Sequence, residues 1–395
     1  MTPLGSAMVG GAALGRLDEA LHKATEDKAV AGVVAVATNR QRALYRGAFG
    51  VADAATGRSL NPDALFRIAS MTKAITTTAA MQLIERGRLR LDDPVEKYLP
   101  SFSRLQVFES FNPATGAYKL HRTTRIATVR HLMTHTSGLG HPITSATLRD
   151  FKPRASEDYP VGPLLFEPGE RWHYGTSIDW LGRLVEALSG RPLDEYFRLH
   201  IFEPLGMADT FYNVPSDKQA RLVAMHHRNS DGTIIKDEVQ PPLNVDPIVG
   251  GSGLSSTASD YIRFVRMILN DGQLDGARIL KADTVEAMAR NAIGAIGVRA
   301  LKTASPQESR DFNFIADGRD KWGLGFLITV DQVPGKRSAA SLSWGGKYNT
   351  YFWIDRTRGI AGVILTQFLP FADREALVLY DTFERGIYQV ADATR

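Results

Sequence analysis

The chain has 395 residues, of which 44% are hydrophobic and 23% charged, and its formal net charge is +4. This is the composition of a globular protein with enough apolar material for a large core. The charge excess is small and no Lys/Arg run concentrates it, so we expect no nucleic-acid partner. The sequence contains no cysteine, which excludes disulfides, thiolate metal sites, iron–sulfur clusters and cysteine nucleophiles.

The N-terminal segment carries no recognisable targeting signal. Residues 1–21 have small apolar side chains but no basic region before them, so we interpret them as a loose N-terminus and not as a signal peptide. No stretch approaches the ~20 apolar residues that a membrane span requires. We therefore expect a soluble, cytoplasmic protein with no membrane partner.

The first predicted elements are a helix and a β-hairpin. An amphipathic pattern from Leu14 predicts a helix. Two β-rich runs, Val33–Ala37 and Ala43–Gly50, flank a polar turn and predict a hairpin. Residues 65–70, Leu-Phe-Arg-Ile-Ala-Ser, form a short strand-like run. The hydrophobic period changes from two to 3.6 at Ser70, where a mostly buried helix is predicted to begin.

Helical patterns broken by Pro and Gly dominate residues 75–245. A further helix follows, with Ser256 and Thr257 as N-cap candidates. From Trp322 onward four strand-like runs suit an antiparallel meander, and residues 372–390 form a last amphipathic helix.

Strands at both ends and helices between them predict an α+β fold. We expect one antiparallel sheet flanked by helices, built from residues 12–74 and 246–395 as a discontinuous domain. Residues 75–245 would form a mostly helical inserted domain. The active site would lie in the cleft between the two.

Several motifs can be set aside. The chain has no G-x-S-x-G, because the nearest string, Gly250–Leu254, ends in Leu, and it has no P-loop or dinucleotide-binding fingerprint. His131 and His135 could share a helical face, but the glutamate of a zinc protease is missing, so we interpret them as a structural, hydrogen-bonded pair. His226 and His227 are interpreted as a surface or loop pair. We predict no metal site.

Ser70-Met71-Thr72-Lys73 is the only Ser-x-x-Lys in the chain. The tetrapeptide is weak evidence by itself, but its place at a predicted helix start strengthens it. Lys73 would lie on the same helix face as Ser70. Backbone N–H groups at the helix N-terminus favour an oxyanion, and burial favours the neutral amine that can accept a serine proton. The alternative is a serine N-cap followed by a solvated lysine.

Two later segments bear on this choice. In Phe166–Ser177, a Pro-Gly turn leads into a helix start and places Tyr174 in an ordered loop. Tyr174 could share proton transfer with Lys73, or it could be a buried aromatic that packs before the helix. The strand Ser341–Lys347 contains two glycines, which often mark a close approach of a ligand to the backbone or, alternatively, a β-bulge.

At this point the sequence resembles the serine β-lactamase and penicillin-binding-protein superfamily, and more narrowly the family VIII carboxylesterases, relatives of class C β-lactamases. The resemblance covers nearly the whole chain, including LFRIASMTKAITTTAAMQLIERGRL, TVRHLMTHTSGL, FEPGERWHYGTSIDWLGRLVEALSG and GGSGLSSTASDY. It implies that Ser70 is the acylated nucleophile, Lys73 its base and Tyr174 a proton shuttle. It also implies an oxyanion hole from the backbone N–H groups of Ser70 and Lys347, and no cofactor.

Departures from the family pattern indicate the substrate. Where β-lactamases carry Lys/His-Thr-Gly on a late strand, this chain has Trp344-Gly345-Gly346 at the presumed substrate-binding positions, and Thr176 replaces an Asn that contacts the substrate amide. Loss of charge-assisted hydrogen bonds worth roughly 1.5–3 kcal/mol would weaken anionic substrates by about one to two powers of ten. The Lys347 side chain could partly compensate if it turned inward.

These features predict a serine carboxylesterase that hydrolyses short-chain acyl esters, with room for weak hydrolysis of β-lactams such as cephalosporins. The alternatives are a class C-like β-lactamase or DD-peptidase, and an acyltransferase of the lovastatin-synthase type. The irregular stretch Leu301–Lys321 could overhang the site or be a simple loop.

Overall fold

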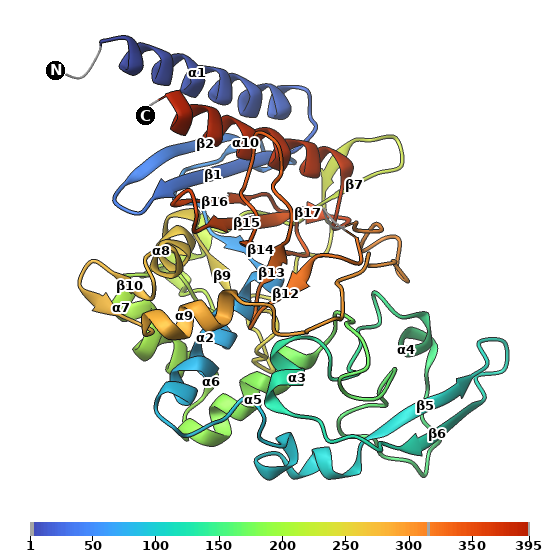
Figure 1. Ribbon diagram of the computed structural model, residues 1–395. Helices are drawn as coiled ribbons and strands as arrows, with labels where there is room; N and C mark the ends of the chain where they lie inside the picture. Colours follow the sequence, from blue (N-terminus) through green and yellow to red (C-terminus); the bar gives the residue numbers. More distant parts are fainter. Residues whose placement is uncertain (1–3, 314–316, 394–395) are drawn as a thin grey trace.

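The computed structural model describes residues 4–313 and 317–393, and its centre is an eight-stranded antiparallel sheet (Figure 1). The strand order is β12-β13-β14-β15-β16-β1-β2-β3. β1 pairs with β16 in the register Val34↔Leu365, so strands from the two ends of the chain share one sheet. Their bounds are β1 (Gly32–Asn39), β2 (Ala43–Asp53), β3 (Arg58–Ser59), β12 (Lys321–Trp322), β13 (Leu327–Thr329), β14 (Ser341–Gly346), β15 (Thr350–Asp355) and β16 (Ile360–Leu365). The predicted α+β fold with an antiparallel sheet is confirmed.

Helices cover both faces of this sheet. The terminal helices α1 (Leu4–Glu26) and α10 (Arg374–Ala393) lie side by side on one face, and α8 (Ala258–Leu269) packs on the other (Figure 1). β15 and β16 are consequently buried along their full length. This explains why their sequences are continuous apolar runs and do not alternate, since both faces of each strand are removed from water.

The N-terminal elements refine the predictions. The first helix begins at Leu4, ten residues before Leu14. The residues from Leu4 onward that we interpreted as a loose N-terminus are therefore part of this helix. The hairpin is confirmed as β1 and β2. The strand-like run before Ser70 shortens to β4 (Phe66–Arg67), which pairs with β9 (Ser255–Ser256). Thr257 caps α8 by accepting the N–H of Asp260, whereas Ser256 belongs to β9.

The middle of the chain is helical but not exclusively so. Its helices are α2 (Thr72–Glu85), α3 (Val129–Met133), α4 (Ala146–Asp150), α5 (Ser177–Ser189), α6 (Leu193–Phe197) and α7 (Glu203–Leu205). A hairpin of β5 (Gln106–Phe111) and β6 (Tyr118–Arg122) projects from this part, and the sequence analysis missed it. A register shift near Ser110 breaks its alternation. The turn residues were the available signal, since Gly116 adopts a φ of 69°.

Shorter elements complete the described chain. They are β7 (His226–Arg228), β8 (Ile234–Lys236), β10 (Gln273–Leu274), β11 (Ala277–Arg278), α9 (Ala282–Ala289) and β17 (Phe368–Leu369). Within residues 4–313 and 317–393, no helix has the length and apolar character needed to cross a bilayer.

The histidine interpretations need correction. α3 ends at Met133, so His131 and His135 do not share a helical face. His131 caps α3 through the Thr128 N–H, whereas His135 lies buried beyond the helix with a φ of 55°. His226 is also buried, on β7, where its Nε2 accepts the Ala54 N–H; it is not a surface or loop residue. Among the described residues, no group of three or more His, Asp or Glu side chains is arranged to hold a metal ion.

Candidate active site

Ser70 lies at the turn that joins β4 to α2. Residues Ala69–Met71 form a short 3-10 helix, and Ala69 adopts a φ of 43°, a left-handed conformation that costs a non-glycine residue about 1–3 kcal/mol. The turn is held by the Ile68 N–H, which donates to the Leu254 carbonyl over 2.9 Å. Ser70 is half-buried and lines a cavity, so a strained but anchored turn presents its hydroxyl to this space.

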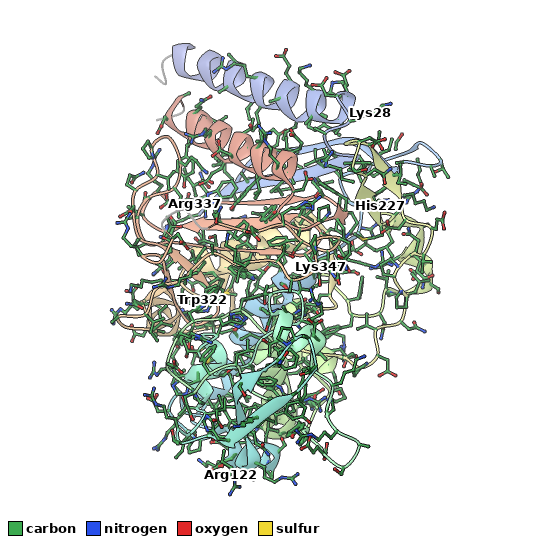
Figure 2. All side chains as sticks on the ribbon, turned by 90° about the vertical axis from the view of Figure 1, so that its right-hand side faces the viewer. Lys28, Arg122, His227, Trp322, Arg337 and Lys347 are labelled. Carbon is green, nitrogen blue, oxygen red and sulfur yellow. The ribbon has the colours of Figure 1, made fainter. Side chains whose placement is uncertain are left out.

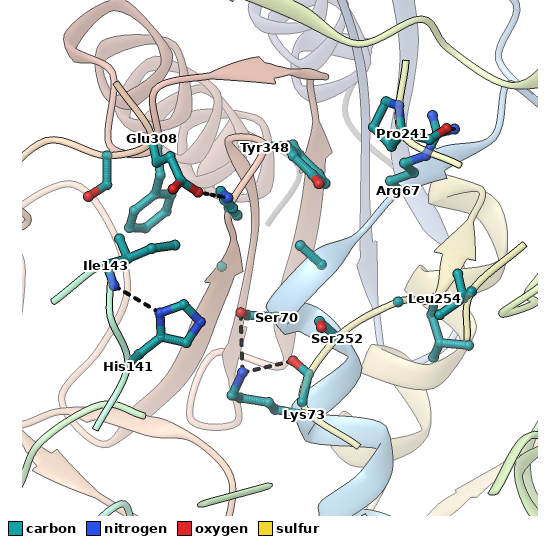
Figure 3. A pocket seen from close by; sticks show the side chains of 18 of the residues that line it. Arg67, Ser70, Lys73, His141, Ile143, Pro241, Ser252, Leu254, Glu308 and Tyr348 are labelled. Carbon is teal, nitrogen blue, oxygen red and sulfur yellow. Dashed lines mark hydrogen bonds and ion pairs between the residues drawn. The ribbon is translucent and has the colours of Figure 1, made fainter. Parts of the chain in front are cut away.

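Lys73 lies one helical turn after Ser70, as the spacing predicts. Its Nζ is 3.3 Å from Ser70 Oγ and 2.7 Å from the Gly251 carbonyl oxygen (Figure 3). The Lys73 side chain is buried. The alternative of a solvated lysine is therefore wrong, and the amine is fixed within hydrogen-bonding reach of the serine hydroxyl.

Tyr174 lies on the other side of Lys73. The Lys73 Nζ is 4.8 Å from the centre of the Tyr174 ring. The Tyr174 hydroxyl is buried and has no hydrogen-bond partner within the described part of the chain. The His135 ring packs 4.8 Å from the Tyr174 ring, and burial together with Lys73 holds the pKa of His135 well below its usual value. The buried His135 ring thus packs against the Tyr174 ring.

Strand β14 borders the Ser70 turn, and its glycines make this contact possible. A Cβ on Gly346 would lie 2.3 Å from the Ile68 carbonyl oxygen, and one on Gly345 would lie 2.7 Å from the Tyr351 ring. We expected a ligand to approach the backbone here. At Gly346 that expectation is wrong, because the group that comes close is the Ile68 carbonyl of the Ser70 turn. This close approach brings the end of β14, and with it Lys347, beside Ser70.

Trp344, which the resemblance aligns with a cation of β-lactamases, lies among aromatic rings. Its ring lies 5.0 Å from the Tyr174 ring and 4.6 Å from the Trp322 ring, and it lines the cavity. Figure 2 shows Lys347 and Trp322 of β12 near the middle of the molecule, with Arg122 of the β5–β6 hairpin at its lower end. The Lys347 side chain forms an ion pair with Glu308 (Figure 3), which neutralises its charge at the cavity.

The cavity has a volume of about 590 Å³. We call the lining formed by Ser70, Lys73, Tyr174 and Trp344 the inner wall. We call the lining formed by residues 241–246, 301–303 and 308–310 the outer wall. The predicted overhang at 301–321 is therefore present for residues 301–303 and 308–310, whereas residues 314–316 lie outside the described part of the chain.

Comparison with known proteins identifies the family. The Beta-lactamase family model matches residues 17–383. The chain belongs to the Beta-lactamase family. It is therefore a member of a group of serine hydrolases and acyltransferases that share this fold.

Individual relatives in this family include both kinds of enzyme. The monacolin J acid methylbutanoyltransferase of Aspergillus terreus is 31% identical, covering 94% of this chain and 95% of that protein. Esterase EstB of Burkholderia gladioli is 29% identical, with 89% of each chain covered. A mutant simvastatin synthase from Aspergillus terreus superposes with a TM-score of 0.83 at 28% identity, covering 96% of this chain and 98% of that chain.

The sequence analysis missed several residues that line the cavity of this Beta-lactamase family member. Asp179, in the first turn of α5, accepts the Gly251 N–H at 2.7 Å. His141 accepts the Ile143 N–H, and burial with nearby Lys73 lowers the pKa of His141 to about 4. The sequence offered one signal for the Asp179 contact, which is proximity to motifs. Asp179 follows Tyr174 by five residues, and Gly251 is part of the Gly-Gly-Ser-Gly string that does not match a nucleophile elbow.

Proposed function

We propose that the protein is a carboxylesterase of the family VIII type, which cleaves short-chain acyl esters through an acyl-enzyme on Ser70. The observation that carries the proposal is the Lys73 amine, held between Ser70 Oγ and the Gly251 carbonyl on the wall of the cavity. Trp344 favours a neutral substrate, because it offers an aromatic surface where a cation would hold a carboxylate.

In the acylation step, Ser70 Oγ attacks the ester carbonyl while Lys73 accepts the serine proton. A general base in this position contributes about 10²–10⁴-fold to the rate. The Tyr174 hydroxyl, which lacks a partner among the described residues, would pass its proton to the alcohol as it leaves and take up the proton that Lys73 accepted from Ser70. The products of this step are the free alcohol and an ester of the acyl group with Ser70.

The developing oxyanion would be held by the backbone N–H groups of Ser70 and Lys347. The close approach of Gly346 to Ile68 supports this pairing, since it brings the end of β14 beside the Ser70 turn. One such donor is worth about 2.7–4 kcal/mol in the transition state. In the deacylation step, Lys73 and Tyr174 activate a water, which attacks the acyl carbonyl and releases the carboxylic acid.

The test of the proposal is Ser70→Ala, assayed with p-nitrophenyl butyrate and with a fluorophosphonate label. Hydrolysis should fall at least about a thousandfold, and labelling should disappear. Ser252→Ala is the matched control, because Ser252 lines the same cavity and should keep both signals. Retention of labelling in Ser70→Ala would overturn the proposal.

An acyltransferase is the second candidate, and the cavity favours it. A volume of about 590 Å³ accommodates a ligand of drug size, more than a short ester needs. Relatives named as acyltransferases are 31% and 32% identical to this chain. Product analysis with added acceptor alcohols separates the two activities, because a transferase yields a new ester in preference to the free acid.

The β-lactamase and DD-peptidase alternative is tested with nitrocefin beside p-nitrophenyl butyrate. We expect ester turnover to exceed nitrocefin turnover, with any cephalosporin hydrolysis weak, since neither Trp344 nor Gly345 can supply a charged donor to a substrate carboxylate. Faster turnover of nitrocefin than of the ester would favour the alternative.

A further inference from the structure

The backbone of Gly251 lies between two charged side chains of the site. Its carbonyl oxygen accepts a hydrogen bond from Lys73 Nζ at 2.7 Å, and its N–H donates to Asp179 Oδ1 at 2.7 Å. No ion pair joins Lys73 directly to a carboxylate within the described residues. Asp179 and Lys73 therefore contact the two consecutive peptide groups that flank the Gly251 Cα, and Lys73 Nζ in turn lies 3.3 Å from Ser70 Oγ.

Only glycine fits between these groups. A Cβ on residue 251 would lie 2.3 Å from Asp179 Oδ1 and 3.2 Å from Lys73 Nζ. The preceding Gly250 is similarly enclosed, with a Cβ position 2.4 Å from the Ile178 carbonyl oxygen. The two glycines thus let the loop pass between α2 and α5 so closely that its peptide groups contact side chains from both helices.

The rest of the loop is anchored without Asp179. The Gly250 carbonyl accepts the Thr76 hydroxyl at 2.6 Å, and the Leu254 N–H donates to the Thr72 hydroxyl at 3.3 Å. The Gly250 carbonyl and the Gly251 N–H belong to the same peptide group, which Thr76 and Asp179 hold from its two sides. Loss of the Asp179 carboxylate would leave this peptide with the Thr76 contact alone, and the loop would stay attached to α2.

We propose that Asp179 is a positioning residue, whose carboxylate fixes the peptide group before Gly251 and thereby places the Gly251 carbonyl that holds the Lys73 amine at Ser70. The inference rests on the proposed function, in which Lys73 accepts the serine proton. It explains a half-buried carboxylate that lines the cavity without a direct ion pair to the lysine. It also explains why the Gly250-Gly251 pair lies beside the Ser70 turn.

The charge of Asp179 gives the proposal a measurable signature. Burial raises the pKa of Asp179, and the charge of Lys73 opposes this rise. The negative charge of Asp179 and a positive charge on Lys73 attract each other, so replacing the carboxylate with a neutral group changes the charge balance at the site. The other charged or titratable groups around the pair are Tyr174, His135 and His141 near Lys73, and Arg183 and Tyr212 near Asp179.

The experiment compares Asp179→Ala and Asp179→Asn in the full chain. The alanine removes the acceptor for the Gly251 N–H, and kcat for p-nitrophenyl butyrate should fall about 10- to 100-fold with little change in KM. The asparagine keeps an acceptor oxygen without the charge. It should retain most of the kcat, while the acid limb of its pH–rate profile moves to lower pH. Gly251→Ala should reproduce the loss seen in Asp179→Ala by clashing with both side chains.

Asp260→Asn is the matched control. Asp260 also accepts a backbone N–H at 2.7 Å, and burial also raises its pKa, but it does not line the cavity. This variant should keep the wild-type kcat and pH profile even if its melting temperature falls. The inference is wrong if Asp179→Ala keeps a kcat within about twofold of wild type, or if the acid limb of Asp179→Asn coincides with that of the wild type. Ester hydrolysis by Ser70→Ala would instead refute the proposed function itself.

Discussion

The two walls of the cavity are built in different ways. The inner wall carries Ser70, Lys73 and Tyr174, on or beside the start of helices, where buried hydrogen bonds fix the Lys73 amine. The outer wall is made of the irregular segments 241–246, 301–303 and 308–310, which include exposed apolar side chains such as Leu243. The proposed proton-transfer groups are thus on anchored elements, whereas the segments that we expect to contact the acyl chain are loops.

Removal of the proton-transfer groups of the inner wall should have the largest effect. We expect Lys73→Ala and Tyr174→Phe each to lower kcat about 10²–10⁴-fold, because each removes a proton carrier. The double variant should lose little more than the worse single variant, since residues that act as one unit are not additive. Steady-state kinetics with p-nitrophenyl butyrate measure these losses.

Lys347→Ala sharpens this comparison because it removes a second lysine side chain that lines the same cavity. Its side chain is ion-paired with Glu308, and the variant keeps the backbone N–H proposed for the oxyanion. A kcat within a few-fold of wild type is expected. Equal losses in Lys73→Ala and Lys347→Ala would contradict the difference between the walls.

The inner wall could be predicted from the sequence to a large extent because its geometry is local. Ser70 and Lys73 are three residues apart on one helix, and the helical period alone brings them together. The antiparallel sheet could be predicted equally well, because β15 and β16 are mostly apolar runs of six residues. The sequence could not place Asp179 against Gly251, because these residues are 72 positions apart and meet only through the packing of α5 on the loop.

The outer wall could not be predicted for a related reason. Residues 301–310 have no hydrophobic period, and their course depends on distant backbone partners, such as the bond from the Ala304 N–H to the Ile143 carbonyl. The β5–β6 hairpin was missed because its register shift near Ser110 interrupts the alternation that identifies a strand. In both cases the path of the backbone depends on contacts between distant residues, and the local hydrophobic pattern of the sequence does not specify it.

After Lys73→Ala and Tyr174→Phe, the next largest loss of activity should follow from adding one methyl group at Gly346. In Gly346→Ala the new Cβ would lie 2.3 Å from the Ile68 carbonyl oxygen, so β14 must move away from the Ser70 turn. We expect kcat to fall about 10²–10³-fold through the displaced oxyanion donor, and stability to fall about 1–3 kcal/mol. Gly15→Ala in α1, where the added Cβ meets no atom within 4 Å, is the control and should keep full activity. Wild-type kcat in Gly346→Ala would remove β14 from the proposed mechanism.

Release of the Lys347 charge should have a smaller and more selective effect. The side chains of Lys347 and Glu308 are 30% and 34% exposed, so their ion pair is worth at most about 1 kcal/mol. Glu308→Gln frees the ammonium at the cavity and should improve kcat/KM for an ester that carries a carboxylate by about threefold to fivefold. The value for p-nitrophenyl butyrate should stay constant. Glu286→Gln, which breaks the Arg356 ion pair away from the cavity, should change neither value, and an equal gain on both esters in Glu308→Gln would contradict the charge argument.

The smallest effect is expected at Leu243, where the outer wall meets a substrate directly. Leu243 lines the cavity yet is 45% exposed, a state in which a long acyl chain could cover its side chain. Burial of such partly exposed apolar area is worth about 1 kcal/mol, or about fivefold in kcat/KM. Leu243→Ala should therefore lower kcat/KM for p-nitrophenyl octanoate about fivefold and leave the acetate ester unchanged. Val239, four residues before Leu243 but 85% exposed and not lining the cavity, provides the control Val239→Ala, which should affect neither ester. A uniform loss on all chain lengths in Leu243→Ala would mean that the outer wall supports the chemistry as well as the fit, and the division between the two walls would then fail.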